Sequence, residues 1–544
     1  MCWETTLSDD GFHVYDTTLR DGAQREGLSF SVADKLAVAR HLDDLGVGFI
    51  EGGWPGANPK DVEFFQRART ELHLQHAQLA AFGATRRAGA KAPDDPQVSA
   101  LRESGAPVIT LVAKAHVGHV TRALRTTPEE NLAMIRDTVT HLRGEGRRVF
   151  LDAEHFFDGY VLDPAYAVEV LRVAAEAGAD VVVLCDTNGG TLPSRLADIV
   201  GTVTGTGLRV GIHAHDDVAC AVANSLAAVE AGATHVQGTA NGYGERCGNA
   251  DILGVVAGLE LKLGRAVLPH GRLGDLGRVS HAVAELANIA PDAHQPYVGA
   301  AAFAHKAGIH VSAVRVAPEL YQHMDPAAVG NDMRLLVSEL AGRATVQLKS
   351  RDLGLSADRA VAGRVLVRVK DMESRGWSFE AAEASFELLL RGEVTGARPS
   401  YFDVESWRVI VETRPDGAVV SEATVKLYAK GERIVATGEG NGPVNALDTA
   451  LRLALERTYP DLGRLELVDY KVRIISAAHG TAAVTRVLVE TSDGEGEWDT
   501  IGVHENVVAA SWDALVEAVT YGLLRRENAD AARQADLPEG TAPP

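Results

Sequence analysis

Short apolar runs alternate with amphipathic stretches through the first half of the chain. In the stretches, apolar residues recur at helical spacing, as at Val32, Leu36 and Leu42 after the helix-capping residue Ser31. The runs return about every 32 residues, which is the length of one strand–helix unit. They lie at 12–16, 48–51, 78–82, 108–112, 149–152, 181–185, 210–213 and 235–238.

Eight strand–helix units in about 250 residues predict an α/β fold, a (β/α)8 barrel over residues 1–275. A doubly wound open sheet is the alternative, but such a sheet usually has fewer strands and often a glycine-rich first turn. The first turn here reads Thr18-Leu19-Arg20-Asp21-Gly22, which does not fit a dinucleotide-binding fingerprint. The barrel is therefore the favoured fold.

The strand–helix period is lost after the barrel. Residues 276–396 are mostly helical in pattern, with polar breaks at 291–296 and 330–332, so we expect helical linker subdomains there. The tail at 527–544 is small, charged and proline-containing, and this composition predicts disorder.

Between the linker and the tail, three strand-like runs and a helix occur twice in succession. The runs lie at 406–413, 419–428 and 433–438 with a helix at 444–457, then at 471–476, 483–490 and 499–503 with a helix at 509–524. At an offset of 64 residues, Gly438 matches Gly502 and Leu451 matches Leu515. This predicts a C-terminal α+β domain over 397–526, made of two βββα modules and suited to dimerisation or effector binding. Chance likeness between two amphipathic helices is the alternative.

Composition and charge exclude several classes of protein. The 544 residues carry a formal net charge of −21, which opposes binding to nucleic acid or to an anionic membrane. No apolar run approaches the ~20 residues that span a bilayer, and residues 1–11 lack the features of a signal peptide. The four cysteines include no CxxC pair. We therefore expect a cytoplasmic protein with no nucleic-acid or membrane partner.

Polar side chains follow several predicted strands, on the side where a (β/α)8 barrel keeps its active site. His213 and His215 end the seventh strand, where alternation points both imidazoles to one side and lets them share a divalent metal ion. Two unrelated polar residues at a strand end are the alternative. Asp21 follows the first strand, a near neighbour of the seventh in a closed barrel, and can add a carboxylate ligand.

Further candidates follow the first, second and eighth strands. Arg20 can hydrogen-bond a substrate oxygen, and Glu51 can fix its guanidinium. A structural ion pair at the barrel mouth is the alternative. The glycine-rich loop 242–250 can approach a ligand closely, and its Asn249 can reach the metal; a flexible connection is the alternative here.

Residues 16–24, Asp-Thr-Thr-Leu-Arg-Asp-Gly-Ala-Gln, resemble the signature of the DRE-TIM metallolyases. Hallmarks of that family are an Arg-Asp on strand one, a Glu on strand two and a His-x-His on strand seven, which here match Arg20, Asp21, Glu51, His213 and His215. The runs 304–310 and 338–343 are similar to linker motifs of the family's synthases. The duplicated module resembles the dimeric regulatory domain of the synthases, which the family's lyases lack.

The resemblance implies an acyltransferase that uses a divalent metal ion (Mg2+, Mn2+ or Zn2+), with acetyl-CoA and a 2-oxo acid as substrates. The implied metal ligands are Asp21, His213, His215 and Asn249. The implied substrate-binding residues are Arg20, Gln24, Glu51 and Thr187. The implied catalytic residues are Arg20, Glu154, His310 and Tyr321, with a surface linker histidine as the alternative for His310.

Residues 51–61, Glu-Gly-Gly-Trp-Pro-Gly-Ala-Asn-Pro-Lys-Asp, most resemble the branch of the family that takes pyruvate as its 2-oxo acid. The implied product is (R)-citramalate, on a route to isoleucine. Isoleucine is then the implied effector, acting on a homodimer or a higher homo-oligomer. One departure is Ser312, which stands where several relatives carry an acidic residue two places after His310.

Other functions stay open at this point. Synthesis of 2-isopropylmalate or homocitrate uses the same chemistry on a larger 2-oxo acid, and one methylene in a pocket is worth only ~1–3 kcal/mol. The C-terminal domain disfavours a carbon–carbon lyase. A biotin-dependent carboxyltransferase needs a lysine near the end of strand six, where this chain reads Val183-Leu184-Cys185-Asp186. A non-enzymatic binding protein is expected to lose a metal ligand, and none is lost.

Overall fold

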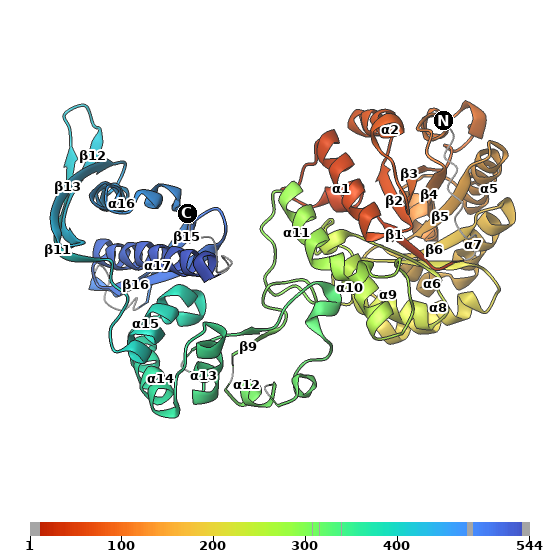
Figure 1. Ribbon diagram of the computed structural model, residues 1–544. Helices are drawn as coiled ribbons and strands as arrows, with labels where there is room; N and C mark the ends of the chain where they lie inside the picture. Colours follow the sequence, from red (N-terminus) through yellow and green to blue (C-terminus); the bar gives the residue numbers. More distant parts are fainter. Residues whose placement is uncertain (1–10, 307, 315, 339, 476–481, 536–544) are drawn as a thin grey trace, which may run out of the picture. The chain divides into compact units, whose positions relative to one another are not determined.

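The chain forms two compact units. A computed structural model describes residues 11–306, 308–314, 316–338, 340–475 and 482–535. The first unit comprises residues 1–303 with 324–333, and the second comprises residues 304–323 with 334–544. The segment 276–396, expected to form linker subdomains, is thus divided between the two units (Figure 1).

The first unit is a closed barrel of eight parallel strands that follow one another in chain order. They are β1 (His13–Asp16), β2 (Phe49–Gly53), β3 (Gln78–Ala84), β4 (Val108–Lys114), β5 (Arg148–Glu154), β6 (Val181–Asp186), β7 (Val210–Ala214) and β8 (His235–Gly238). Strand β1 pairs with β8, with Tyr15 opposite Gln237, and this pairing closes the ring. The predicted (β/α)8 barrel is confirmed, and every predicted strand ends within two residues of the observed one.

Helices surround the barrel, as Figure 1 shows. They are α1 (Val32–Leu45), α2 (Pro59–Glu71), α3 (Pro96–Glu103), α4 (Val117–Arg122), α5 (Pro128–Gly144), α6 (Phe156–Leu162), α7 (Pro164–Ala177), α8 (Pro193–Thr204), α9 (Ala221–Glu230), α10 (Ile252–Leu261) and α11 (Leu276–Leu286). Helix α1 shows how the sequence sets such bounds: Ser31 and Asp34 form a capping box at its start, and Gly46 ends it in the left-handed conformation.

The barrel interior is filled by large side chains. Tyr15, Phe49, Phe150 and Val183 are among the members of one buried cluster there. Because these residues fill the middle of the barrel, the ends of the strands and the loops that follow them are left to form a site.

The second unit begins with the remaining linker segments. Its helices are α12 (Gly308–Val314), α13 (Arg343–Asp352), α14 (Arg359–Ser374) and α15 (Glu383–Thr395). The helical prediction missed one feature, a pair of two-residue parallel strands, β9 (Ala304–His305) and β10 (Arg334–Leu335). Val346, Val365, Phe379 and Phe386 are among the residues that form the core of this part.

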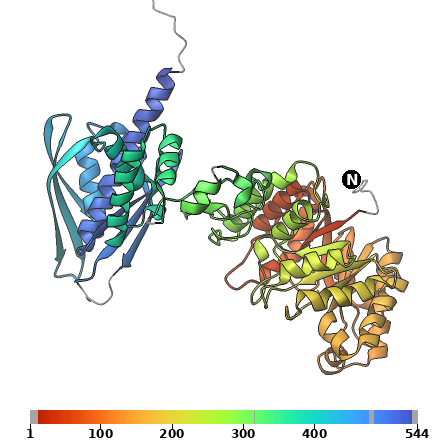
Figure 2. The same ribbon diagram turned by 90° about the horizontal axis from the view of Figure 1, so that it is seen from below.

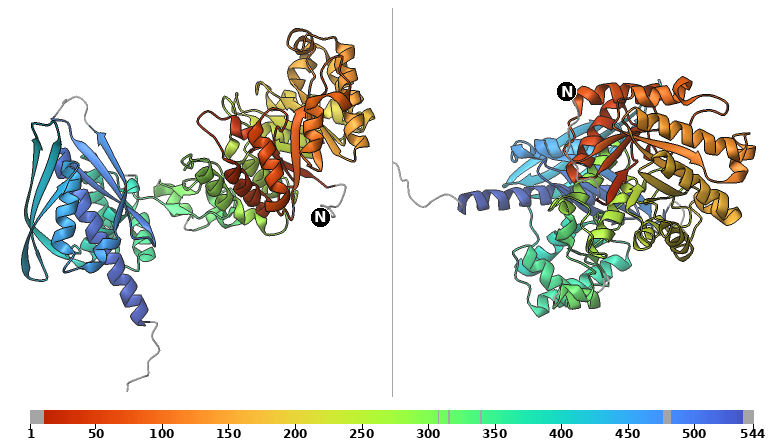
Figure 3. Two further views of the ribbon diagram at one scale, coloured as in Figure 1. Left: turned by 90° about the horizontal axis from the view of Figure 1, so that it is seen from above. Right: turned by 90° about the vertical axis from the view of Figure 1, so that its right-hand side faces the viewer.

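The duplicated module is confirmed as two three-stranded antiparallel sheets, each followed by a helix. The elements are β11 (Phe402–Thr413), β12 (Val419–Ala429), β13 (Glu432–Gly440), α16 (Pro443–Leu455), β14 (Glu466–Ile474), β15 (Thr485–Ser492), β16 (Glu497–His504) and α17 (Val507–Ala535). Helices α16 and α17 contact one another and lie between the two sheets (Figure 3). Gly438 and Gly502 hold equivalent places, since a Cβ on either would overlap the backbone of its own helix.

Helix α17 corrects the prediction for the tail. It runs as one long helix to Ala535, so the disorder expected from residue 527 is wrong for 527–535, and residues 536–544 lie outside the described part (Figure 2). The alanines within residues 527–535 favour a helix and outweigh the polar composition of this segment. Residues 507–531 are also long and apolar enough to cross a membrane, but 67% of the most apolar stretch is buried, as expected of a core helix.

Candidate metal centre and active site

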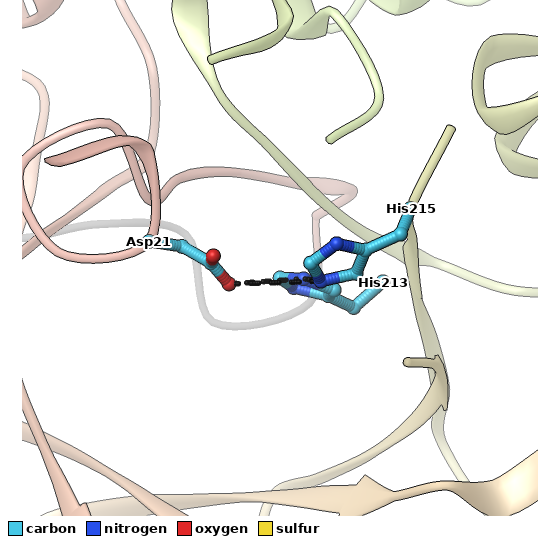
Figure 4. Close-up of side chains that lie close together, drawn as sticks. All are labelled: Asp21, His213 and His215. Atoms are coloured by element: carbon cyan, nitrogen blue, oxygen red, sulfur yellow. Dashed lines mark hydrogen bonds and ion pairs between the residues drawn. The ribbon is translucent and has the colours of Figure 1, made fainter. Parts of the chain in front are cut away.

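Asp21, His213 and His215 converge at the carboxyl end of the barrel strands (Figure 4). Asp21 Oδ2 lies 3.3 Å from His213 Nε2 and 4.0 Å from His215 Nε2, and the two imidazole nitrogens are 3.3 Å apart. All three side chains are buried. They meet because Asp21 follows β1, His213 lies in β7 with His215 directly after it, and both strands pair with β8.

These three donor atoms fit a divalent cation. A point equidistant from three atoms at these separations lies about 2 Å from each, which is the usual length of a metal–nitrogen or metal–carboxylate bond. Asn249 supplies a further indication, because its Oδ1 is buried without a hydrogen-bond partner in the described part of the chain. Its backbone forms a β-bridge with His215, and its Nδ2 donates to the carbonyl of Tyr243 at 3.0 Å.

The charges at the centre keep Asp21 ionised and His215 neutral, but they favour a proton on His213. Burial alone would raise the pKa of Asp21, but the charge of Arg20 and the contact with His213 outweigh it and hold that pKa well below its usual range. Burial acts against the pKa of His213, yet the neighbouring Asp21 carboxylate raises it above its ordinary value. Burial and the nearby His213 lower the pKa of His215 to about 4.

These shifts predict how metal affinity depends on pH. A cation must displace the proton that Asp21 favours on His213, so we expect affinity for Mn2+ to fall by about tenfold per pH unit below the raised pKa of His213. The pKa of His215 is lowered to about 4, so this ring is expected to be neutral between pH 5 and 8. Metal binding should therefore displace one proton and not two over that range. Calorimetric titration of the metal-free protein with Mn2+ measures this slope. A hundredfold change per unit, or no change, contradicts the assignment.

Arg20 is held rigidly beside the metal centre. Its Nε donates to Glu51 Oε2 at 2.5 Å and its Nη1 to Asp21 Oδ2 at 3.0 Å, while its guanidinium lies 3.8 Å from the centroid of the Phe82 ring. Within the described residues, Nη2 has no partner and is left for a ligand. Glu51 is fully buried and also accepts a hydrogen bond from Tyr15 at 2.7 Å. Glu51 therefore fixes Arg20, and it does not line the cavity described next.

A cavity of about 620 Å3 opens at the metal centre. Predicted residues on its wall are Arg20, Asp21, Gln24, Glu154, Thr187, His213 and His215. Thr187 Oγ1 accepts from the backbone N–H of His155 at 2.8 Å, so its own hydrogen is free to point to a ligand. Glu154 forms an ion pair with Lys114, the last residue of β4, and burial lowers the pKa of that lysine.

His310 and Tyr321 belong to the second unit, where their rings stack with centroids 4.2 Å apart and their side chains are exposed. Their predicted part in catalysis therefore depends on the sequence motif alone.

Several residues of the site were missed or underrated by the sequence analysis. Lys114 and Asp152 line the cavity, and burial with the charge of Glu51 raises the pKa of Asp152 to about 7. Gln237 bonds both Asp152 and His213 from inside β8. The strand alternation that predicted the direction of the His213 side chain also points the Gln237 side chain into the barrel. The same pattern could therefore have identified Gln237 from the sequence.

Family comparisons define the class of protein. Residues 12–283 match the HMGL-like family, residues 297–376 match the homocitrate synthase post-HMGL domain-like family, and residues 380–523 match the LeuA allosteric (dimerisation) domain. The molecule thus combines an HMGL-like barrel, whose mouth carries the Asp–His–His cluster, with a LeuA-type C-terminal domain.

Full-length relatives narrow the class. An (R)-citramalate synthase from Streptomyces coelicolor is 66% identical over 96% of this chain and 98% of its own, and one from Synechocystis is 49% identical over 94% and 96%. A probable 2-isopropylmalate synthase from Methanopyrus kandleri is 32% identical over 95% and 100%. The chain belongs to the (R)-citramalate synthase family within the DRE-TIM metallolyases.

Proposed function

We propose that this chain is an acyltransferase that condenses acetyl-CoA with pyruvate and water to give (R)-citramalate and CoA, on a route to isoleucine. The observation that carries the proposal is the convergence of Asp21, His213 and His215 on one point of a cavity that Arg20 also lines. The identity of 66% to a full-length (R)-citramalate synthase supports pyruvate over the larger 2-oxo acids of the sister synthases.

The chemistry has two difficult steps, loss of a proton from the acetyl methyl group and attack of that carbon on a ketone. Asp21, His213 and His215, with Asn249 as a fourth ligand, would hold a divalent cation (Mg2+, Mn2+ or Zn2+), which would supply Lewis acidity toward the keto acid. Arg20 Nη2 donates a hydrogen bond to the alkoxide oxygen as charge develops on it.

Other cavity residues orient the substrates and handle protons. Thr187 donates its hydroxyl hydrogen to the carboxylate of the keto acid, and Gln24 adds a polar group on the cavity wall. Glu154, paired with Lys114, accepts the methyl proton or activates the water that cleaves the thioester. His310 and Tyr321 are proposed to assist these proton transfers, on the strength of the linker motif that contains His310.

Release of free CoA from acetyl-CoA, followed with a thiol reagent, tests the function. Pyruvate, 2-oxoisovalerate, glyoxylate and 2-oxoglutarate are offered in turn with Mg2+, Mn2+ or Zn2+. We expect the highest kcat/KM with pyruvate. A preference for 2-oxoisovalerate or 2-oxoglutarate overturns the choice of substrate but keeps the reaction class, and no release with any keto acid overturns the function.

We propose that isoleucine inhibits the enzyme through the C-terminal domain and that the chain works as a homodimer or higher homo-oligomer. The LeuA-type match over residues 380–523 and the duplicated modules support both. Truncation after Thr395 removes both modules, so we expect it to abolish inhibition by isoleucine. A truncated enzyme that keeps both activity and inhibition contradicts the proposal.

The full-length protein offers a second test of the same regulation. Hydrogen exchange with and without isoleucine is expected to show protection within residues 397–526. Protection confined to the barrel contradicts the assignment. Leucine and valine serve as matched ligands to define the effector.

A cytoplasmic location is proposed together with this metabolic role. Cys185, Cys220 and Cys247 are free thiols, and this state suits a reducing compartment.

A further inference from the structure

The two histidines of the metal centre differ in how their second ring nitrogen is held. His213 Nδ1 lies 2.8 Å from Gln237 Oε1, whereas His215 Nδ1 is buried with no hydrogen-bond partner among the residues that the structure describes. The Nε2 atoms of both rings face Asp21, as Figure 4 shows. Of the two imidazoles, only that of His213 therefore has a hydrogen-bond partner at Nδ1, the ring nitrogen that faces away from Asp21.

The other contacts of Gln237 determine which way its amide points. Its Nε2 donates to Asp152 Oδ1 at 3.0 Å and lies 3.3 Å from His235 Nε2. In the structure the amide nitrogen faces Asp152 and the amide oxygen faces His213, and this orientation suits the ionised form of Asp152, which only accepts hydrogen bonds. Gln237 and His235 are fully buried, and Asp152 is 3% exposed, so solvent does not compete for these bonds.

The position of Gln237 comes from barrel closure. In the register of the sheet, Gln237 of β8 pairs with His213 of β7 on one side and with Tyr15 of β1 on the other. The neighbouring interior residues include Tyr15, Phe150 and Val183, which form a largely apolar layer. An amide in such a layer is costly unless its hydrogen bonds are satisfied, and here they are satisfied by a metal-centre residue and a carboxylate.

We propose that Gln237 is a positioning residue that holds His213 in the tautomer and orientation needed to bind a cation through Nε2. An acceptor at Nδ1 requires the ring hydrogen on Nδ1, which leaves the lone pair of Nε2 directed at the ion. Asp152 sets the amide orientation, so it acts through Gln237. This inference rests on the proposed metal centre, to which it adds Gln237 as the residue that positions one ligand.

The Gln237→Met variant tests the role directly, because methionine keeps the length of the side chain and removes both the acceptor and the donor. We expect its affinity for Mn2+, measured by calorimetry without substrate, to fall by on the order of 10- to 100-fold. Gln237→Glu keeps an acceptor for His213 Nδ1–H and is expected to retain more of the affinity than Gln237→Met. Affinity within twofold of wild type in Gln237→Met overturns the proposal.

A spectroscopic readout on the wild-type enzyme separates positioning from a general structural role, and it needs a variant only to assign the resonance. In the Zn2+-loaded enzyme with 15N-labelled histidine, we expect His213 to show a slowly exchanging Nδ1–H resonance, assigned by its loss in His213→Gln. His215 is the internal control, because its buried Nδ1–H has no acceptor among the described residues and should lack the downfield proton shift that a hydrogen bond gives. Binding of His213 through Nδ1, or an Nδ1–H of His213 that lies no further downfield than that of His215, overturns the proposal.

The same titrations distinguish failure of this inference from failure of the metal centre itself. If His213→Gln binds Mn2+ as wild type does, the proposed metal centre is wrong and the role of Gln237 goes with it. If His213→Gln loses binding while Gln237→Met keeps it, the role of Gln237 alone is wrong.

Discussion

The Asp21→Ala variant is expected to lower kcat for CoA release by on the order of 10³-fold or more. Its carboxylate is the one anionic donor among the three converging groups, and it also accepts a hydrogen bond from Arg20. Without it, two neutral imidazoles and the Asn249 amide must hold the cation. Bound Mn2+ after gel filtration should fall in parallel with turnover, because loss of the ion is the physical cause.

A matched control is available at the amino end of the barrel. Asp180 accepts a hydrogen bond from Arg148 Nε at 2.9 Å just before β6 begins, far along the strands from the metal centre. Asp180→Ala therefore removes a barrel ion pair without touching the site, and we expect its kcat and metal content to match wild type. Near-normal turnover in metal-depleted Asp21→Ala would exclude the proposed chemistry.

Arg20→Lys is expected to lower kcat by about 10²- to 10³-fold, the usual cost of removing one oxyanion donor. Lysine keeps a positive charge against the buried Glu51 but lacks the fork that lets Nε and Nη1 bind carboxylates while Nη2 stays free. Steady-state kinetics with pyruvate measures the effect. Because the contact strengthens as charge develops, kcat should fall more than KM rises.

Two control measurements distinguish loss of the Nη2 hydrogen bond from loss of the metal ion or of the fold in Arg20→Lys. The affinity for Mn2+ in Arg20→Lys should stay within about tenfold of wild type, since the three donor groups remain. The thermal midpoint should stay close to wild type, because the buried Glu51 keeps a cationic partner. A kcat within tenfold of wild type contradicts the role given to Nη2.

The barrel and the convergence of Asp21, His213 and His215 could be predicted because the signals are local. Strand ends are marked by the change from apolar to polar residues, and alternation alone puts His213 and His215 on one side of β7. Closure of an eight-stranded ring then brings Asp21 to them, whatever the details of packing.

The rest depends on contacts that no local pattern carries. Strand alternation places Gln237 inside the barrel, but its contact with His213 also needs the register of β8 on β7, and Phe82 packs on Arg20 from two strands away. The lengths of these side chains set the contacts, and periodicity does not report them. The prediction of disorder was wrong for residues 527–535, because the high helix propensity of their alanines outweighs their polar composition.

A crystal structure with Mn2+ and pyruvate, phased on the anomalous signal of manganese, tests the central claim most directly. The account predicts one anomalous peak bonded to Asp21, His213 and His215, with the carboxylate and keto oxygens of pyruvate on the same ion and Arg20 Nη2 on the keto oxygen. A peak elsewhere, or pyruvate bound away from the ion, contradicts it.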